Sequence, residues 1–180
     1  MKIKVVGILV LSLLSLFFSG CGSAEKKVEP VELKTSVKIK ADADNEKLIL
    51  GALWIMQNRT PDFFKLVDQN VKEIRQSTGQ FTTGPVKTIE GTGRIEFQKF
   101  SGHYNEYNIA DFLVHEATHI VDQKKGLPLT RVAEIRARET EIAFLKELAK
   151  AENRSFDQII NFVKKEIDQI KAGKLYSDLD

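Results

Sequence analysis

The chain has 180 residues, of which 42% are hydrophobic and 29% charged, a balance typical of a globular protein and not of a disordered or polytopic membrane protein. Its formal net charge is +2, and because Lys2 and Lys4 account for that excess, the rest of the chain is electrically balanced. A balanced chain lacks the basic surface that nucleic-acid binding requires, so we expect no nucleic-acid partner. The single cysteine, Cys21, excludes an intrachain disulfide framework and a cysteine-based zinc cage.

The first 20 residues have the pattern of a secretory signal peptide. Two lysines precede an apolar run, residues 5–18, that is too short to cross a bilayer comfortably. The run ends at Ser19-Gly20-Cys21, which resembles the lipobox of bacterial lipoproteins, although Phe18 stands where leucine is usual. This resemblance implies a lipidated Cys21 as the new N-terminus and a protein anchored in the bacterial cell envelope, outside the cytoplasm. An ordinary cleaved signal or a single N-terminal anchor is the alternative.

Residues 21–44 are rich in Lys, Glu, Ala and Val and show no sustained helical periodicity. They predict a flexible tether, with a short strand near residues 37–39 as the one exception. The globular domain then spans residues 45–180.

Two helices are expected at the start of this domain. Residues 48–56 are almost wholly apolar and follow Asp44 and Asn45, both good caps, which favours a buried helix. Thr60-Pro61 then supplies a cap and a first-turn proline for a second helix. Its apolar positions continue at helical spacing through Ile74, and Ser77-Thr78-Gly79 ends it.

The next segment has the pattern of a β-hairpin. Residues 86–90 and 94–100 flank Gly91-Thr92-Gly93, and apolar and polar side chains alternate in the second of these stretches. No other part of the domain indicates a sheet.

Three further helices follow the hairpin. The first begins with a capping box at Asn108, with Asp111 in place of glutamate, and ends before Gly126. Thr130 caps the next, over residues 131–150, and a capping box at Ser155 opens the last, which ends near residue 173. About five helices and one small hairpin predict a mostly helical α+β fold.

His115, Glu116 and His119 form the pattern HExxH within the third predicted helix. Two histidines four residues apart lie on one helical face, so their nitrogens can converge on one cation at roughly 2.0 to 2.1 Å. Glu116 has a different azimuth and can therefore act as general base on a metal-activated water without being a ligand. A purely structural role for the two histidines is the alternative.

A catalytic zinc site needs a third protein ligand. The extended motif with a third histidine fails here, because Asp122 stands in place of its glycine and Lys125 in place of the histidine. A carboxylate must therefore serve, and the following helix carries three of them, Glu134, Glu139 and Glu141.

Helical phase separates these three carboxylates. Glu134 and Glu141 fall within ~20° of each other, whereas Glu139 lies ~140° from Glu134. Glu134 is preferred as ligand because the small Ala137 one turn later leaves space for the metal and the imidazole rings. Glu141 stays open as the alternative ligand, and both Glu141 and Asp122 are candidates to orient a ligand histidine.

The HExxH helix, followed about fifteen residues later by ExxA on a second helix, resembles the gluzincin metallopeptidases, especially those with a minimal domain. The resemblance implies a zinc ion held by His115, His119 and Glu134, with Glu116 as the catalytic base. It also implies that residues 94–100 form the edge strand that holds a peptide substrate.

Peptide hydrolysis also needs a hydrogen-bond donor at the developing oxyanion. His103, Tyr104 and Tyr107, just before the HExxH helix, are candidates, with an ordinary surface loop as the alternative. The sequence thus favours a membrane-anchored zinc peptidase that acts on a peptide or protein. Two alternatives are a non-catalytic envelope lipoprotein that keeps the zinc site as a binding module, and a structural protein in which zinc ties two helices together.

Overall fold

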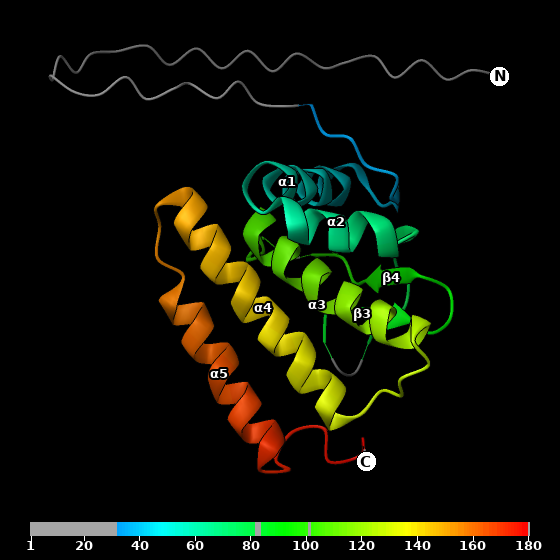
Figure 1. Cartoon of the computed structure of the whole chain (residues 1–180). Helices are drawn as coiled ribbons and strands as arrows, with labels where there is room; N and C mark the ends of the chain where they lie inside the picture. The colour runs from blue at the N-terminus through cyan, green and yellow to red at the C-terminus, as the bar shows by residue number, and fades with distance from the viewer. Residues whose placement is uncertain (1–31, 82–83, 101, 180) are drawn as a thin grey trace, which may run out of the picture.

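The computed structural model describes residues 32–81, 84–100 and 102–179 (Figure 1). Cys21 and the expected signal peptide lie outside these ranges. Within them the elements are β1 (Lys38–Lys40), α1 (Ala43–Arg59), α2 (Pro61–Asn70), β2 (Glu73–Gln76), β3 (Val86–Ile89), β4 (Arg94–Phe97), α3 (Glu106–Lys124), α4 (Arg131–Glu152) and α5 (Asp157–Lys171). The predicted mostly helical α+β fold is confirmed. None of the described helices has the length and apolarity needed to cross a membrane.

The first two helices form a pair at Thr60. The side chain of Asp42 caps α1 by accepting a hydrogen bond from the Asn45 amide at 3.0 Å. Pro61 occupies the first turn of α2, where its missing amide hydrogen costs nothing. Thr60 holds the cap position of α2, but its hydroxyl donates to the Met56 carbonyl and does not receive a bond from α2.

The expectation that the second helix continues to Ser77 is wrong. The helix ends at Asn70, Val71 is extended, and Glu73–Gln76 form β2. Ile74 is 1% exposed in this strand. Strand β2 pairs with β1 on one side and β4 on the other, and these strands satisfy its backbone hydrogen-bonding groups. The spacing of apolar residues within this segment fits a helix as well, so the sequence alone did not predict the strand.

The strands form one sheet in the order β1-β2-β4-β3, with β1, β2 and β4 parallel and β3 antiparallel to β4. The predicted hairpin is confirmed, since Val86 pairs with Phe97 and Ile89 with Arg94. The expectation that residues 94–100 provide the edge strand is wrong, because β2 covers that side of β4. The edge next to α3 is β3.

The folded part of the chain begins before residue 45. Val37 is 7% exposed and belongs to the hydrophobic core, and Lys38–Lys40 form β1. The second half of the stretch expected to be a tether therefore includes an edge strand of the sheet.

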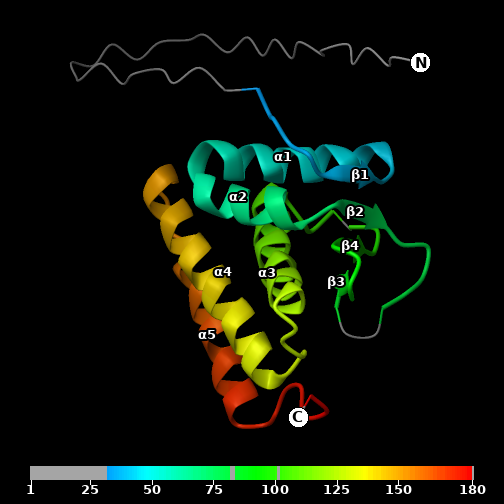
Figure 2. The same ribbon diagram turned by 45° about the vertical axis from the view of Figure 1, so that its right-hand side comes forward.

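Helix α3 is the central element, with the sheet on one side and α4 and α5 on the other (Figure 2). It starts earlier than expected, because the capping box forms between Asn105 and Asn108 and not between Asn108 and Asp111. The Asn105 side chain accepts from the Asn108 amide at 3.1 Å, and the Asn108 side chain accepts from the Asn105 amide at 3.1 Å. Gly126, with φ of 71°, ends the helix in the left-handed region.

The last two helices fold back against α3. Thr130 caps α4 as predicted, by accepting from the Ala133 amide at 3.2 Å. The capping box expected at Ser155 does not form, because its hydroxyl accepts from the Asp157 amide instead. After α5 the chain returns to the start of α4, where the Arg131 amide donates to the Leu179 carbonyl at 3.3 Å, and Figure 1 shows the C-terminus there.

Candidate metal centre

Three buried side chains from α3 and α4 meet at one point. The Nε2 atoms of His115 and His119 lie 2.9 Å apart. Glu134 Oε2 lies 3.6 Å from the first of these nitrogens, and Glu134 Oε1 lies 3.3 Å from the second. All three residues are at most 8% exposed, and one ligand atom from each lies within 4.8 Å of the others. This group could hold a metal ion.

The donor atoms of the group fit a cation. Glu134 Oε2 is buried without a hydrogen-bond partner among the described residues, which costs about 1 to 3 kcal/mol for a polar group. The two facing imidazole nitrogens can share at most one proton between them at 2.9 Å. A cation placed among these atoms would satisfy the carboxylate oxygen and both nitrogens at once.

The local sequence explains why α4 comes so close to α3. Ala117 on α3 and Ala133 and Ala137 on α4 are at most 3% exposed, and their short side chains allow the two helices to approach. Glu134 therefore reaches the histidines, whereas Glu139 is exposed to solvent. The structure thus brings together the three residues that the motif and the helical phase had favoured.

Glu141 contacts the other ring nitrogen of His115, Nδ1, from within the core. This contact fixes the ring so that Nε2 faces His119 and Glu134. Burial alone would lower the pKa of His115, but the neighbouring carboxylates of Glu134 and Glu141 raise it to about 10. Burial opposes the shift of Glu134 as well, yet the two histidines hold the pKa of its carboxyl well below its usual range.

A cluster of acidic groups lies behind His115. Burial and the neighbouring Glu141 raise the pKa of Asp111 well above its usual value, and burial also raises the pKa of Glu166. Arg138 supplies positive charge to this acidic cluster, since its Nη1 atom lies 3.1 Å from Oε1 of Glu141 and 3.3 Å from Oε2 of Glu166. Arg138 therefore joins α5 to the residue that orients His115.

Glu116 takes no part in the ligand cluster. The Thr88 hydroxyl, on β3, donates a hydrogen bond to Glu116 Oε2 at 2.6 Å, and Glu116 is 8% exposed. The carboxylate is thereby held beside the histidines but free of the positions that a ligand would take. The sequence analysis did not identify Thr88. It lies in strand β3, which contacts α3, but only the folded sheet shows that this strand lies beside Glu116.

A cavity of about 220 Å³ opens onto the ligand cluster. Its lining comes from β3, α3, the start of α4 and the C-terminal segment: Val86, Lys87, Thr88, His115, Glu116, His119, Gln123, Leu129, Glu134, Tyr176, Asp178 and Leu179. Edge strand β3 thus forms one wall of the cavity, and the C-terminal segment forms another. The site combines a potential metal-binding group, a free carboxylate and room for a small part of a ligand.

The other candidate residues from the sequence lie elsewhere. His103 is exposed, and the ring of Tyr104 packs edge-on against Phe100 and Phe112. Tyr107 lines a different hollow. The structure places none of these three candidates along the cavity.

Asp122 pairs with an arginine of α4 and is not part of the ligand cluster. It is 4% exposed and forms an ion pair with Arg136. Asp122 thus connects α3 to α4 through this ion pair and does not orient a ligand histidine.

Tyr176 was missed by sequence reasoning but lies in the cavity wall. Its φ of 55° places it in the left-handed region, which is uncommon for a residue other than glycine, asparagine or aspartate. Burial and the charge of Glu134 raise the pKa of the Tyr176 phenol, so it carries its proton at neutral pH. No local sequence signal marks it, because the chain returns to the site only through tertiary packing.

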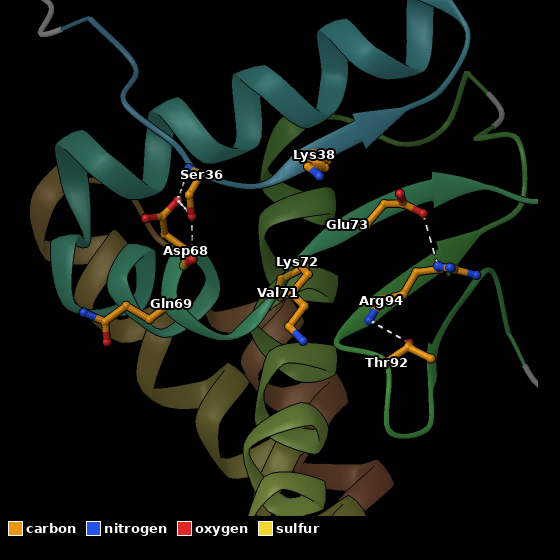
Figure 3. A pocket seen from close by; sticks show the side chains of 9 residues that line it. All are labelled: Ser36, Lys38, Asp68, Gln69, Val71, Lys72, Glu73, Thr92 and Arg94. Atoms are coloured by element: carbon orange, nitrogen blue, oxygen red, sulfur yellow. Dashed lines mark hydrogen bonds and ion pairs between the residues drawn. The ribbon is translucent and has the colours of Figure 1, made fainter.

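A larger hollow of about 420 Å³ lies away from this site, between β1, β2 and the end of α2 (Figure 3). Two pairs of its polar groups contact each other: Asp68 accepts from the Ser36 amide at 2.7 Å, and Glu73 forms an ion pair with Arg94 at 3.1 Å. It therefore has the character of a solvated surface groove.

No family model matches the chain, and no curated protein matches it either.

Proposed function

We propose that this chain is a zinc-dependent peptidase. The observation that carries the proposal is the buried set of His115, His119 and Glu134 beside Glu116, a carboxylate that is not part of the set but lines the same cavity. A site that only stored a metal ion would have no need of an unligated carboxylate held in place by a separate hydroxyl group.

The donor set favours zinc. Two imidazole nitrogens and one carboxylate oxygen are the ligands of many catalytic zinc sites, in which the fourth position stays open. When bound, zinc supplies Lewis acidity that polarises a carbonyl group and lowers the pKa of water.

The chain's own residues would carry the proton transfers. Glu116 accepts a proton from the attacking water as the water oxygen bonds to the carbonyl carbon of the peptide. The same carboxyl then gives that proton to the amide nitrogen as the C–N bond breaks, so the products are a carboxylic acid and an amine, which end as a carboxylate and an ammonium group once the acid's proton passes to the amine. Thr88 keeps Glu116 oriented through the 2.6 Å hydrogen bond.

Strand β3 supports a peptide as the substrate. It is the edge strand beside the cavity, so its outer backbone groups have no strand partner among the described residues. An extended peptide can pair with such an edge, which would lay its scissile bond along the cavity.

A structural zinc site is the less favoured reading. A closed site needs a fourth protein ligand. Of the described acids that the sequence offered for that role, Glu141 is engaged with His115 and Arg138, and Asp122 with Arg136. A non-catalytic envelope lipoprotein that uses the site for binding is the second candidate, and the Ser19-Gly20-Cys21 pattern favours an envelope anchor in either case.

The test is digestion of a broad peptide library by the zinc-loaded protein, with cleavage read by mass spectrometry. We expect cleavage that stops when a chelator removes the metal and in Glu116→Gln, but continues in Glu139→Gln, which changes an exposed acid on the neighbouring helix. Stoichiometric zinc without cleavage of any peptide would refute the peptidase and favour the binding lipoprotein.

A further inference from the structure

We infer that the outer face of the sheet binds an anionic lipid surface, with the phosphate groups of the lipids as its ligands. The inference goes beyond the proposed peptidase and does not depend on it. The surface in question, the basic face, is formed by strands β1, β2 and β4 and consists of Lys38, Lys40, Glu73, Arg75, Arg94 and Glu96, with Lys72 at its rim.

The alternation of the strands places these charged side chains together. Ile39, Ile74 and Ile95 pair with one another in adjacent strands and pack into the hydrophobic core. Their neighbours on either side along each strand therefore point away from the core. Strand pairing aligns these neighbours in two rows, Lys38, Glu73 and Arg94 in the first and Lys40, Arg75 and Glu96 in the second.

Positive charge exceeds negative charge on the basic face. Three of its cations lie 2.7 to 3.1 Å from a single carboxylate, that of Glu73: Lys40, Arg75 and Arg94. Arg94 also faces Glu96, at 3.7 Å. One carboxylate compensates only one positive charge, so the face stays cationic even where its side chains are paired. The chain beyond its first 20 residues is electrically balanced, so this excess is a local feature.

The hollow of about 420 Å³ shown in Figure 3 lies within the basic face and has room for a phosphate group. Lys38, Lys72 and Arg94 line it. Both lysines are exposed and have no ion pair among the described residues. Asp68 also lines the hollow, beside Ser36, whose amide donates to it at 2.7 Å. A lipid phosphate in this hollow would supply the acceptor that the two lysines lack.

The basic face lies where an envelope anchor would bring it to a bilayer. Strand β1 begins at Lys38, and residues 22–31 separate Cys21 from Glu32, the first described residue. A chain of that length reaches at most about 40 Å. A lipid on Cys21 would therefore keep the basic face near the bilayer and raise its effective concentration there, so that a few cations suffice for binding.

Docking through the basic face leaves the candidate metal centre accessible. The cavity beside His115 and His119 is lined by β3, α3, the start of α4 and the C-terminal segment. None of the described residues that line it belongs to the basic face. The bilayer would thus orient the cavity without covering it.

The test uses the full-length protein in vesicles of phosphatidylcholine, with or without anionic phosphatidylglycerol. Acetylation of each lysine by an amine-directed reagent is followed by mass spectrometry. We expect Lys38, Lys40 and Lys72 to react at least about fivefold more slowly on the anionic vesicles, and high salt to remove this protection, because the attraction is electrostatic. Lys164 and Lys165, which are exposed on α5, should react equally on both kinds of vesicle.

Two double variants with the same net charge make the comparison sharper. Lys38→Gln with Lys72→Gln removes two exposed charges at the basic face, and Lys164→Gln with Lys165→Gln removes two from α5. Each basic residue near an anionic bilayer strengthens binding about fivefold, so the first variant should associate about 25-fold more weakly and Lys40 should lose its protection. The α5 variant should keep it. Melting temperatures equal to that of the wild type would show that both variants fold.

Equal acetylation on the two kinds of vesicle, protection that survives high salt, or equal protection of Lys40 in both double variants would overturn the inference. Protection by soluble polyphosphate without protection by anionic vesicles would overturn it too, because the basic face would then bind a polymer and not a membrane. Neither zinc content nor peptide cleavage enters the measurement, so failure of the peptidase proposal would leave this test unaffected.

Discussion

Glu134 and Glu141 lie two turns apart on one face of α4, and their neighbours give them different roles. Glu134 faces the Nε2 atoms of both histidines, whereas Glu141 faces the Nδ1 atom of His115 and the guanidinium of Arg138. Helical phase alone reduces the three candidate metal ligands of α4 to these two residues. It does not show which of the two is the ligand, because that depends on which atoms of α3 each carboxylate contacts.

We therefore expect Glu134→Ala to abolish stoichiometric zinc binding, because it removes a ligand. Glu141→Ala should weaken binding by about 10- to 100-fold, the usual cost of losing a group that orients a ligand. Glu139→Ala is the control, since Glu139 is exposed to solvent. Titration with a competing chromogenic chelator gives all three affinities, and equal losses at Glu134 and Glu139 would contradict the geometry.

The affinity for zinc should depend on pH through His115. In the metal-free protein its pKa is raised from 6.5 to about 10, so zinc must displace a proton from this ring at neutral pH. We expect the affinity to rise about tenfold per pH unit between pH 7 and pH 9 and to level off above about 10.

The same proton stabilises the metal-free fold. Because the pKa of His115 is higher in the folded than in the unfolded protein, the stability that this proton contributes is complete below pH 6.5 and is lost as pH rises through about 10.

Calorimetric titration of zinc in buffers of different ionisation enthalpy counts the protons that zinc binding releases. A count of zero at pH 7.5 would contradict a protonated His115.

At the scale of elements, the helices were predictable where their ends are marked by local chemistry. Thr130 caps α4 and Gly126 ends α3, as expected from residues adjacent in sequence. Strand β2 was not predictable in this way, because Ile74 also fits the apolar spacing of the preceding helix. Its pairing with β1 and β4 decides the conformation, and these partners lie far away in the sequence.

The same long-range pairing makes β3, and not β4, the edge strand of this hairpin. The hairpin itself follows from local turn residues, but which of its strands is the edge depends on where β2 docks. Thr88 belongs to the site for this reason, since β3 and not β4 lies against α3.

The connection between α3 and α4 offers a test at this scale. Gly126 has φ of 71° and nothing within 4 Å of the position that a Cβ atom would take, so only backbone strain opposes a side chain there. Gly126→Ala should lower the free energy of unfolding by about 1 kcal/mol.

Gly102→Ala is the matched control, because that position is equally open and carries no such φ. Urea unfolding of both variants measures the difference. Equal stability of the two variants would show that the turn does not require the left-handed conformation.

In the molecule as a whole, α3 packs between the sheet and the α4–α5 pair (Figure 2). The C-terminal segment returns to the start of α4, where the Leu179 carbonyl accepts a hydrogen bond from the Arg131 amide. This topology brings residues from four parts of the chain, namely β3, α3, the start of α4 and the C-terminal segment, around one cavity. The HExxH pair and Glu134 were predictable because one helix and one short turn place them. Thr88 and Tyr176 were not, since they reach the site only when the entire chain has folded.

The N-terminal pattern leads to a prediction about location. If Cys21 carries the lipid, the protein should fractionate with membranes, and Cys21→Ser should release it wherever a signal peptidase still cleaves the chain. Metabolic labelling with a fatty-acid probe, followed by fractionation, measures both effects. A wild type that takes up no label would count against the lipid anchor.

We propose that a zinc ion binds three side chains of α3 and α4 and keeps one coordination position open. An anomalous difference map from crystals of the zinc-loaded protein, recorded at the zinc edge, locates the ion. We expect one peak about 2.0 to 2.1 Å from Nε2 of His115 and of His119 and at similar distance from a Glu134 oxygen, with no fourth protein ligand and Glu116 uncoordinated. A peak elsewhere, or a fourth side chain on the metal, would contradict it.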